Sequence, residues 1–320
     1  MGKRNTKLNN AKQNKFDEFY TPLSDIEAVL SQHTEHFRGK SVYCNCDDYE
    51  KSNFVRYFRD NFDRLGLQKL TATNYNPKSI QQTLTGVVSD PSKSAYRYVM
   101  QDGKEEVTVL EGDGDFRSSE CIDLLKESDI IVTNPPFSLL RAYIEQLLDY
   151  NKHFMIICEQ NAVTYPRIFE NIVNGSFRIL RDAKSTIKFE VPDCYLKQRA
   201  GVYYIDKYFR VFVSVNIKWL TNLDINQQYE MIELHKRYSP AEYPKYDNYD
   251  AIEVSKYIDI PIDYTGLMGL PITFLDKYNP EQFEIAANDV DAVQDRLVLH
   301  GKRMYARILV RNRHPAGGDV

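Results

Sequence analysis

Two periodicities of apolar residues divide the first two thirds of the chain into alternating strands and helices. Short runs rich in β-branched residues predict buried strands, and apolar residues spaced three and four apart predict helices that cover them. The expected strands span residues 41–46, 69–74, 129–133 and 153–158, and the expected helices span 24–37, 50–65, 118–126, 138–150 and 165–173. This alternation indicates an α/β protein with a doubly wound, mostly parallel sheet.

Other regions depart from this alternation. Residues 83–110 have the pattern of a β-hairpin with its turn at Asp102-Gly103. Strand-like runs at 186–191, 201–205 and 210–219 predict that the sheet closes with antiparallel strands, and short extended pieces are expected at 272–275 and 305–310. We therefore expect a flexible basic tail over residues 1–16, an α/β domain over 17–220 and a less regular region over 221–320.

Composition limits the class of protein. No run of about 18 uncharged apolar residues occurs, and the N-terminus lacks the apolar segment of a signal peptide. We therefore expect an intracellular protein without a membrane segment. The five cysteines are an odd number without a C-x-x-C pair, which predicts reduced thiols. Cys44 and Cys46 have no second Cys or His pair at zinc-site spacing, so we expect no metal.

Charge is segregated along the chain, although the net charge is only −4. Residues 102–129 hold ten acids against three bases, whereas residues 3–15 and 302–313 hold five bases each and no acid. Such basic tracts are typical of phosphate contacts, but a solvated surface or an unstructured tail has the same composition. The candidate DNA-binding residues are Lys3, Arg4, Lys7, Lys12, Lys15, Lys302, Arg303 and Arg307.

The most specific chemical signal is Asn134-Pro135-Pro136-Phe137, which directly follows the expected strand 129–133. Ligands of doubly wound sheets bind beyond the carboxyl ends of the strands. Two prolines hold this loop rigid, which presents the Asn134 side chain in one orientation. The purely structural alternative is a rigid Pro-Pro turn capped by Asn.

An exocyclic amine on an aromatic ring is a poor nucleophile, because its lone pair is delocalised. The Asn134 carboxamide oxygen and the Pro135 carbonyl can accept both of its N–H bonds, which favours a pyramidal nitrogen with its lone pair turned to a methyl donor. Phe137 can stack on a base that has left its helix. The motif therefore predicts methyl transfer to an amino group of a base.

Several stretches over most of the chain resemble the adenine-N6 DNA methyltransferases, and most of all the EcoRI-type modification methyltransferases. Residues 17–21 (DEFYT), 42–48 (VYCNCDD) and 111–117 (EGDGDFR) are similar to the cofactor motifs of this family, and residues 134–137 to its catalytic motif. Residues 269–274 and 278–280 resemble its C-terminal half. Cofactor motifs, catalytic motif and a long C-terminal region follow one another in the order of the gamma arrangement.

The resemblance implies a class I, Rossmann-like methyltransferase that transfers a methyl group from S-adenosylmethionine to the N6 amine of a flipped-out adenine in duplex DNA. Residues 17–220 would form the catalytic domain, and residues 221–320 would recognise the target. The implied catalytic residues are Asn134, Pro135, Pro136 and Phe137. The residues implied around S-adenosylmethionine are Tyr20, Thr21, Asn45, Asp47, Asp113, Asp115 and Phe116.

The resemblance further implies a cytoplasmic enzyme of a bacterium or phage, with a cognate restriction endonuclease, where one exists, encoded separately. We expect a monomer, since nothing in the sequence indicates a dimer interface. The glycine-rich loop usual after the first strand is missing, and residues 44–48 stand in its place. Two alternatives therefore stay open: the same chemistry on RNA or on protein glutamine, and a catalytically inactive DNA-binding module with this fold.

Overall fold

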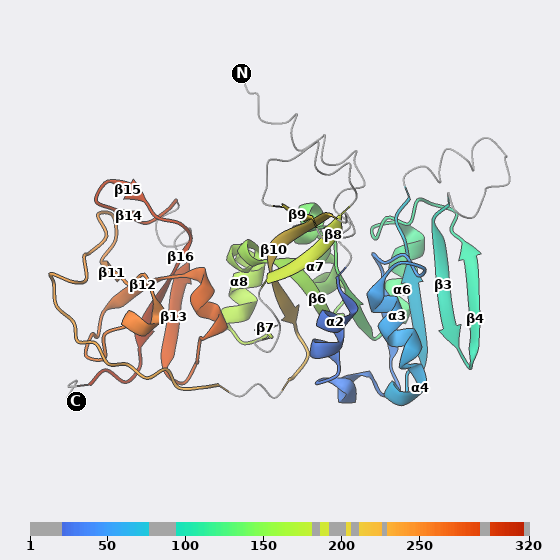
Figure 1. Ribbon diagram of the computed structural model, residues 1–320, viewed down its shortest axis with the longest axis horizontal. Helices are drawn as coiled ribbons and strands as arrows, with labels where there is room; N and C mark the ends of the chain where they lie inside the picture. Colours follow the sequence, from blue (N-terminus) through green and yellow to red (C-terminus); the bar gives the residue numbers. More distant parts are fainter. Residues whose placement is uncertain are drawn as a thin grey trace, which may run out of the picture. The chain divides into compact units, whose positions relative to one another are not determined.

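The computed structural model describes residues 21–76, 94–180, 186–191, 203–205, 211–225, 229–288 and 295–316. The chain forms two compact units (Figure 1). The first unit consists of Met1–Gln160 and Asp182–Ile225, and the second consists of Asn161–Arg181 and Asn226–Val320. No helix among the described residues is long and apolar enough to cross a membrane.

Four parallel strands form the centre of the sheet in the first unit. They are β1 (Ser41–Cys44), β2 (Lys69–Thr73), β5 (Ile130–Thr133) and β6 (His153–Glu159). β1 lies between β2 and β5, with Tyr43 opposite Thr71 on one side and Ile131 on the other. β1, β2 and β5 are buried almost throughout, as their continuous apolar runs predict.

Antiparallel strands extend the sheet on both sides, in the order β4-β3-β2-β1-β5-β6-β10. On one side is the expected hairpin of β3 (Tyr96–Gln101) and β4 (Lys104–Val109), with positive φ at both turn residues, Asp102 and Gly103. On the other side, β10 (Val211–Thr221) pairs with β6, β8 (Thr186–Val191) and β9 (Tyr203–Ile205). The doubly wound, mostly parallel α/β fold is therefore confirmed.

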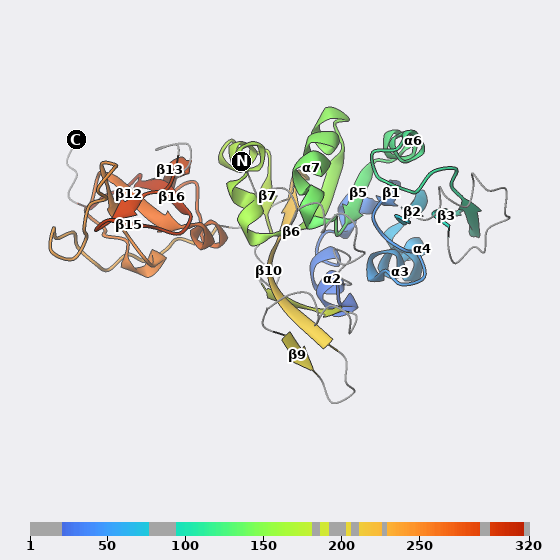
Figure 2. The same ribbon diagram turned by 90° about the horizontal axis from the view of Figure 1, so that it is seen from above.

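Helices cover both faces of this sheet. Figure 2 shows α6 and α7 on one face and α2, α3 and α4 on the other. Ser52 and Ser118 begin two of them, because each side-chain oxygen accepts a hydrogen bond from a backbone N–H of the first turn. Gly66, in the left-handed region, ends α4. The bounds are α2 (Leu23–Leu30), η1 (Thr34–Phe37), α3 (Asn53–Asp60), α4 (Phe62–Leu65), α6 (Ser119–Glu127), η3 (Phe137–Leu139) and α7 (Leu140–Asp149).

Two expected helices are each divided in the structure. The helix expected over 24–37 ends at Leu30, and η1 follows it, so that Phe37 is buried with its ring 5.1 Å from that of Phe58. The helix expected over 50–65 becomes α3 and α4, which meet at Asn61. Apolar spacing is similar in α- and 3₁₀-turns of this length, so it did not reveal the interruptions.

A second sheet, in the order β11-β12-β16-β13, organises the second unit. Its strands are β11 (Ala251–Glu253), β12 (Leu267–Pro271), β13 (Phe283–Asn288) and β16 (Arg307–Asn312). The smaller elements are η4 (Gln160–Thr164), which begins in the first unit, α8 (Pro166–Val173), β7 (Arg178–Ile179), η6 (Tyr257–Asp259), η7 (Ile272–Asp276), β14 (Val298–Leu299) and β15 (Lys302–Arg303).

The extended conformation expected over 272–275 is wrong, because these residues form the 3₁₀ helix η7. Pro271 precedes the helix and has a φ of −56°, which suits a helix start. The turn buries Ile272, Phe274 and Leu275 together, and the Phe274 ring packs edge-on against Phe283 at 5.3 Å. Tertiary packing therefore outweighed the local preference for a strand.

Candidate active site

The ends of β1, β2 and β5 place most of the candidate site residues along one edge of the sheet, which we call the carboxyl edge. Asn45 and Asp47 follow β1, and Asn134 follows β5 directly. The three strands are parallel and end at this same edge, and the sheet continues from β1 to both sides, to β2 on one side and to β5 on the other. Such a topological switch point is where open α/β sheets bind their ligands.

The Asn-Pro-Pro-Phe loop continues β5 without a gap and leads into η3. Pro135 is buried, whereas Asn134, Pro136 and Phe137 are partly accessible. The backbone N–H of Leu139 donates to the Pro136 carbonyl at 2.9 Å, which closes the turn after the motif. The side chains of Asn134 and Phe137 therefore stand at the carboxyl edge on a short, well-defined loop.

Asp47 connects three elements of this edge. Its Oδ1 accepts a hydrogen bond from the Ser52 hydroxyl and its Oδ2 accepts one from the Thr133 hydroxyl, both at 2.5 Å. Its backbone N–H donates to the Thr73 carbonyl at 3.0 Å. Burial raises the pKa of the Asp47 carboxyl to about 6, although both hydroxyl donors lower it.

Asn45 and Phe116 lie on two sides of Tyr143, a residue of α7. The Tyr143 hydroxyl donates to the Asn45 side-chain oxygen, and the rings of Tyr143 and Phe116 meet edge-on at 5.1 Å. All three side chains are buried. Tyr143 was not expected at the site; its only signal in the sequence is a hydroxyl on the apolar face of a helix, where a partner is required.

Asp113 and Asp115 differ in the number of hydrogen bonds that their carboxylates accept from the described residues. Arg117 donates to the Asp115 carboxylate from its backbone N–H, Nε and Nη2 at 2.9, 2.8 and 2.6 Å. Burial opposes ionisation of Asp115, but these bonds together lower its pKa. Among the described residues, the Asp113 carboxylate accepts only the N–H of Asp115, at 3.1 Å.

The loop around Asp113 is packed against the end of β2. The N–H of Asn76 donates to the Asp113 carbonyl at 2.7 Å. Gly114 has a φ of +73°, and a Cβ at this position would collide with the carbonyl oxygen of Asn74. Only glycine satisfies both conditions. The close contact holds the acidic loop beside Tyr75, a 43% exposed ring that the sequence did not single out.

Thr21 is the first described residue and is 3% exposed. Its carbonyl accepts a hydrogen bond from the Asn53 side chain at 2.8 Å. Its hydroxyl is buried without a hydrogen-bond partner among the described residues, a costly state unless a ligand or another part of the chain completes it. Tyr20, the other candidate of this stretch, lies outside the described residues.

Comparisons with known proteins identify the family of the chain. Residues 7–313 match the model of the family described as adenine-specific methyltransferase EcoRI. The chain belongs to this family. It is 44% identical to the Type II methyltransferase M.EcoRI of Escherichia coli, over 97% of this chain and 97% of that protein.

Two further relatives of this EcoRI-family chain come from mycoplasmas. The Type II methyltransferase M.MpnI of Mycoplasma pneumoniae is 37% identical over 96% of this chain and 98% of its own, and M.MgeORF184P of Mycoplasma genitalium is 34% identical over 95% and 98%. A crystal structure described as a putative RNA methyltransferase of Pyrococcus horikoshii has a TM-score of 0.30 and 15% identity over 69% of this chain and 100% of that chain, which is too distant to bear on function.

The basic residues expected to bind DNA in this family member differ in their exposure to solvent. Lys302 and Arg303 form the exposed β15, and Arg303 pairs with Asp295 at 2.6 Å. Arg307 corrects the expectation: its side chain is 8% exposed, and its guanidinium is bonded to the buried Glu253. A run of bases cannot reveal that one member points into the core. Lys3, Arg4, Lys7, Lys12 and Lys15 lie outside the described residues.

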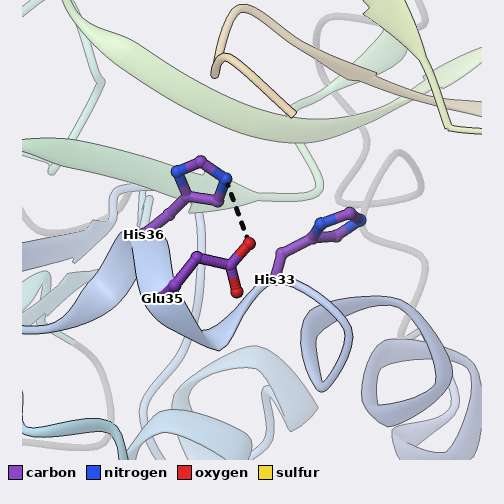
Figure 3. Close-up of side chains that lie close together, drawn as sticks. All are labelled: His33, Glu35 and His36. Carbon is purple, nitrogen blue, oxygen red and sulfur yellow. Dashed lines mark ion pairs between the residues drawn. The ribbon is translucent and has the colours of Figure 1, made fainter. Parts of the chain in front are cut away.

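One group of side chains in the described part of this methyltransferase has the composition of a metal site. It consists of His33, Glu35 and His36, whose ligand atoms lie within 4.8 Å of one another. Figure 3 shows the Glu35 carboxylate near the His36 ring, to which it is paired at 3.5 Å. The group precedes β1, so it lies away from the carboxyl edge, and the Glu35 side chain is 67% exposed to competing water.

Proposed function

We propose that this chain transfers a methyl group from S-adenosylmethionine to the exocyclic N6 amine of a flipped-out adenine at specific sites of duplex DNA. The observation that carries the proposal is the position of Asn134-Pro135-Pro136-Phe137. The motif follows β5 directly, at the switch point beside β1, and Thr133 connects its first residue to the β1 loop.

The chemistry assigned to this loop is the activation of a poor nucleophile. The Asn134 carboxamide oxygen and the Pro135 carbonyl accept the two N–H bonds of the adenine amine, so that its lone pair is released from the ring toward the methyl donor. Phe137, partly accessible at the start of η3, stacks on the extruded base. No side chain in this scheme needs to abstract a proton before the transfer.

Two observations support S-adenosylmethionine as the methyl donor at this edge. The buried Thr21 hydroxyl has no partner among the described residues, and the Asp113 carboxylate is only half buried and accepts one internal bond. A hydroxyl and a carboxylate suit the amino, ribose and sulfonium groups of this donor. When bound, S-adenosylmethionine supplies an activated methyl group on a sulfonium.

The remaining cofactor candidates divide by their contacts. We assign Tyr20, Thr21 and Asp113 to direct contact with the cofactor. Asn45 and Phe116 shape the buried wall of its pocket through Tyr143, and Asp115 holds Arg117. The exposed Tyr75, beside the Asp113 loop, offers a ring face to the cofactor or the DNA.

Duplex DNA is the proposed partner. We assign residues 17–220 to catalysis and residues 221–320 to target recognition, with the bases of residues 3–15 and the exposed Lys302 and Arg303 on phosphates. We further propose a monomeric, cytoplasmic enzyme. Any cognate restriction endonuclease would be a separate chain.

The deciding experiment offers isotope-labelled S-adenosylmethionine with duplex DNA, structured RNA or a protein extract. We expect label on DNA alone, recovered as N6-methyladenine after digestion. Asn134→Ala should reduce the rate by about 100- to 1000-fold, because one preorganised acceptor at the reacting centre is lost, and should leave cofactor affinity unchanged. Label on RNA or on protein would show that this molecule, and not DNA, is the substrate. Cofactor that fails to bind even at millimolar concentration would indicate an inactive DNA-binding module.

A further inference from the structure

We propose that Asp47 is a positioning residue for the catalytic loop: its carboxylate fixes Thr133, and through it Asn134, and does not bind the cofactor. The inference rests on the proposed function, since it assigns Asn134 to catalysis. It changes the role that the family resemblance implies for Asp47, which is that of a cofactor ligand.

The bonds of Asp47 tie together the segments that surround the switch point. The carboxylate takes one hydroxyl from Ser52, which begins α3, and one from Thr133, which ends β5. The Asp47 N–H adds a third connection, to the carbonyl of Thr73 at the end of β2. The Asp47 side chain therefore fixes the end of β5 and the start of α3 relative to the loop after β1, and its backbone N–H fixes the end of β2.

The environment of the carboxylate suits this role better than ligand binding. Asp47 is 7% exposed and Thr133 is 0% exposed, and each carboxylate oxygen already faces a protein hydroxyl. Hydrogen bonds from a hydroxyl to a carboxylate are short and about twice as strong as those between neutral groups. The half-buried Asp113, whose carboxylate accepts one bond from the described residues, is the better ligand for the cofactor.

The orientation of Asn134 is thereby determined from both sides. On its C-terminal side, Pro135 restricts the backbone of Asn134 to extended conformations. On its N-terminal side, the Thr133 hydroxyl is held on Asp47. A displacement of about 1 Å at a reacting centre can lower a rate by about 100-fold. Loss of the Thr133 bond should therefore lower the rate of methyl transfer.

The test compares Asp47→Asn, Thr133→Val and the double variant with wild type. Rate constants are measured at saturating S-adenosylmethionine and DNA, and cofactor affinity by calorimetry. We expect each single variant to lower kcat by about 10- to 100-fold and to leave the dissociation constant for S-adenosylmethionine within about threefold of wild type, a ΔΔG near 0.6 kcal/mol. The double variant should be no worse than the more damaging single one, because Asp47→Asn weakens and Thr133→Val removes the same bond.

Two controls separate positioning from a general loss of structure. Thr133→Ser keeps the hydroxyl and should restore most of kcat. Thr221→Val removes a buried threonine hydroxyl of similar setting, which donates to the Phe154 carbonyl at 2.6 Å at the start of β6, far along the strand from the carboxyl edge. It should leave kcat unchanged. If Asp47→Asn does not fold, Thr133→Val against Thr133→Ser decides the question.

Two results would overturn the positioning role. One is a cofactor affinity at least tenfold weaker in Asp47→Asn with kcat preserved at saturation, which would make Asp47 a ligand. The other is a Thr133→Val enzyme as active as wild type. A wild-type protein that methylates no DNA in the same assay would instead refute the proposed function, so the two failures are distinguishable.

Discussion

Arg307 and Glu253 form a buried, two-point ion pair in the second unit. Arg307 Nε donates to Oε2 of Glu253 at 3.0 Å, and Nη2 donates to Oε1 at 2.9 Å. The hydroxyls of Tyr246 and Ser255 also donate to this carboxylate. Burial disfavours the charge on Glu253, but Arg307 and the hydroxyls together lower its pKa. The pair connects β11 to β16 through their side chains.

Removal of Arg307 should therefore destabilise the fold rather than weaken DNA binding directly. Arg307→Met leaves the Glu253 carboxylate buried without its main partner, and we expect a loss of about 3 to 5 kcal/mol in the free energy of unfolding. Urea unfolding measures it. The matched change Arg303→Met affects a pair whose arginine is 70% exposed and should cost at most about 1 kcal/mol. Equal losses in the two variants would contradict the structural role of the buried pair.

Asp113 and Asp115 should respond differently to removal. Asp113→Ala should weaken S-adenosylmethionine binding by about 10- to 100-fold, the usual contribution of a hydrogen bond to a charged group. Asp115→Ala removes the ion pair with Arg117 instead. Because a surface ion pair contributes little, the affinity for S-adenosylmethionine should change by less than about threefold. Isothermal titration of both variants provides the comparison. A larger loss of affinity in Asp115→Ala than in Asp113→Ala would mean that Asp115, and not Asp113, binds the cofactor.

The raised pKa of Asp47 predicts a specific pH dependence of stability. Because the pKa in the folded protein is about 6 and lies above the usual range of an aspartate, Asp47 contributes stability that is full below about pH 4 and is lost as the pH rises through 6. Asp48 is the acidic neighbour that adds to the shift, while Cys44 and Tyr143, whose own pKa values are raised mainly by burial and to a lesser degree by the Asp47 charge, stay neutral.

The measurement compares wild type with Asp47→Asn, which lacks this titration. The free energy of unfolding of wild type relative to the variant should fall by roughly 2 kcal/mol between pH 4 and pH 7. Carboxyls with lowered pKa values, such as Glu253, act in the opposite direction but are common to both proteins. A difference between the two proteins that is independent of pH would show that Asp47 titrates normally.

The basic N-terminal tract can be tested by deletion of residues 1–14, which removes Lys3, Arg4, Lys7 and Lys12 and leaves residues 17–21 in place. We expect weaker binding to specific and nonspecific duplexes alike, with unchanged cofactor binding. Each lost phosphate contact should lower the slope of log affinity against log salt by about 0.9. Fluorescence anisotropy at a series of salt concentrations measures the slope. An unchanged slope would mean that the tract contacts no phosphate.

The sequence by itself determined the central strands of the sheet and the position of the Asn-Pro-Pro-Phe motif. Short β-branched runs that alternate with amphipathic helices indicate buried parallel strands, and a loop that follows such a strand lies at the carboxyl edge. This is why Asn134 could be placed without coordinates. The turn at Asp102-Gly103 could also be predicted from the sequence, because the positive φ that both residues adopt is a local requirement of this turn.

Only the tertiary structure decided which charged and polar side chains are free to act. Asp47 and Asp113 look alike in the sequence, yet one is buried between two hydroxyls and the other is half buried. Arg307 continues a basic run but points to Glu253. The reason is physical: local sequence fixes backbone periodicity, whereas the state of a polar group depends on partners brought from far along the chain, 86 residues away for Thr133 and Asp47 and 54 for Arg307 and Glu253.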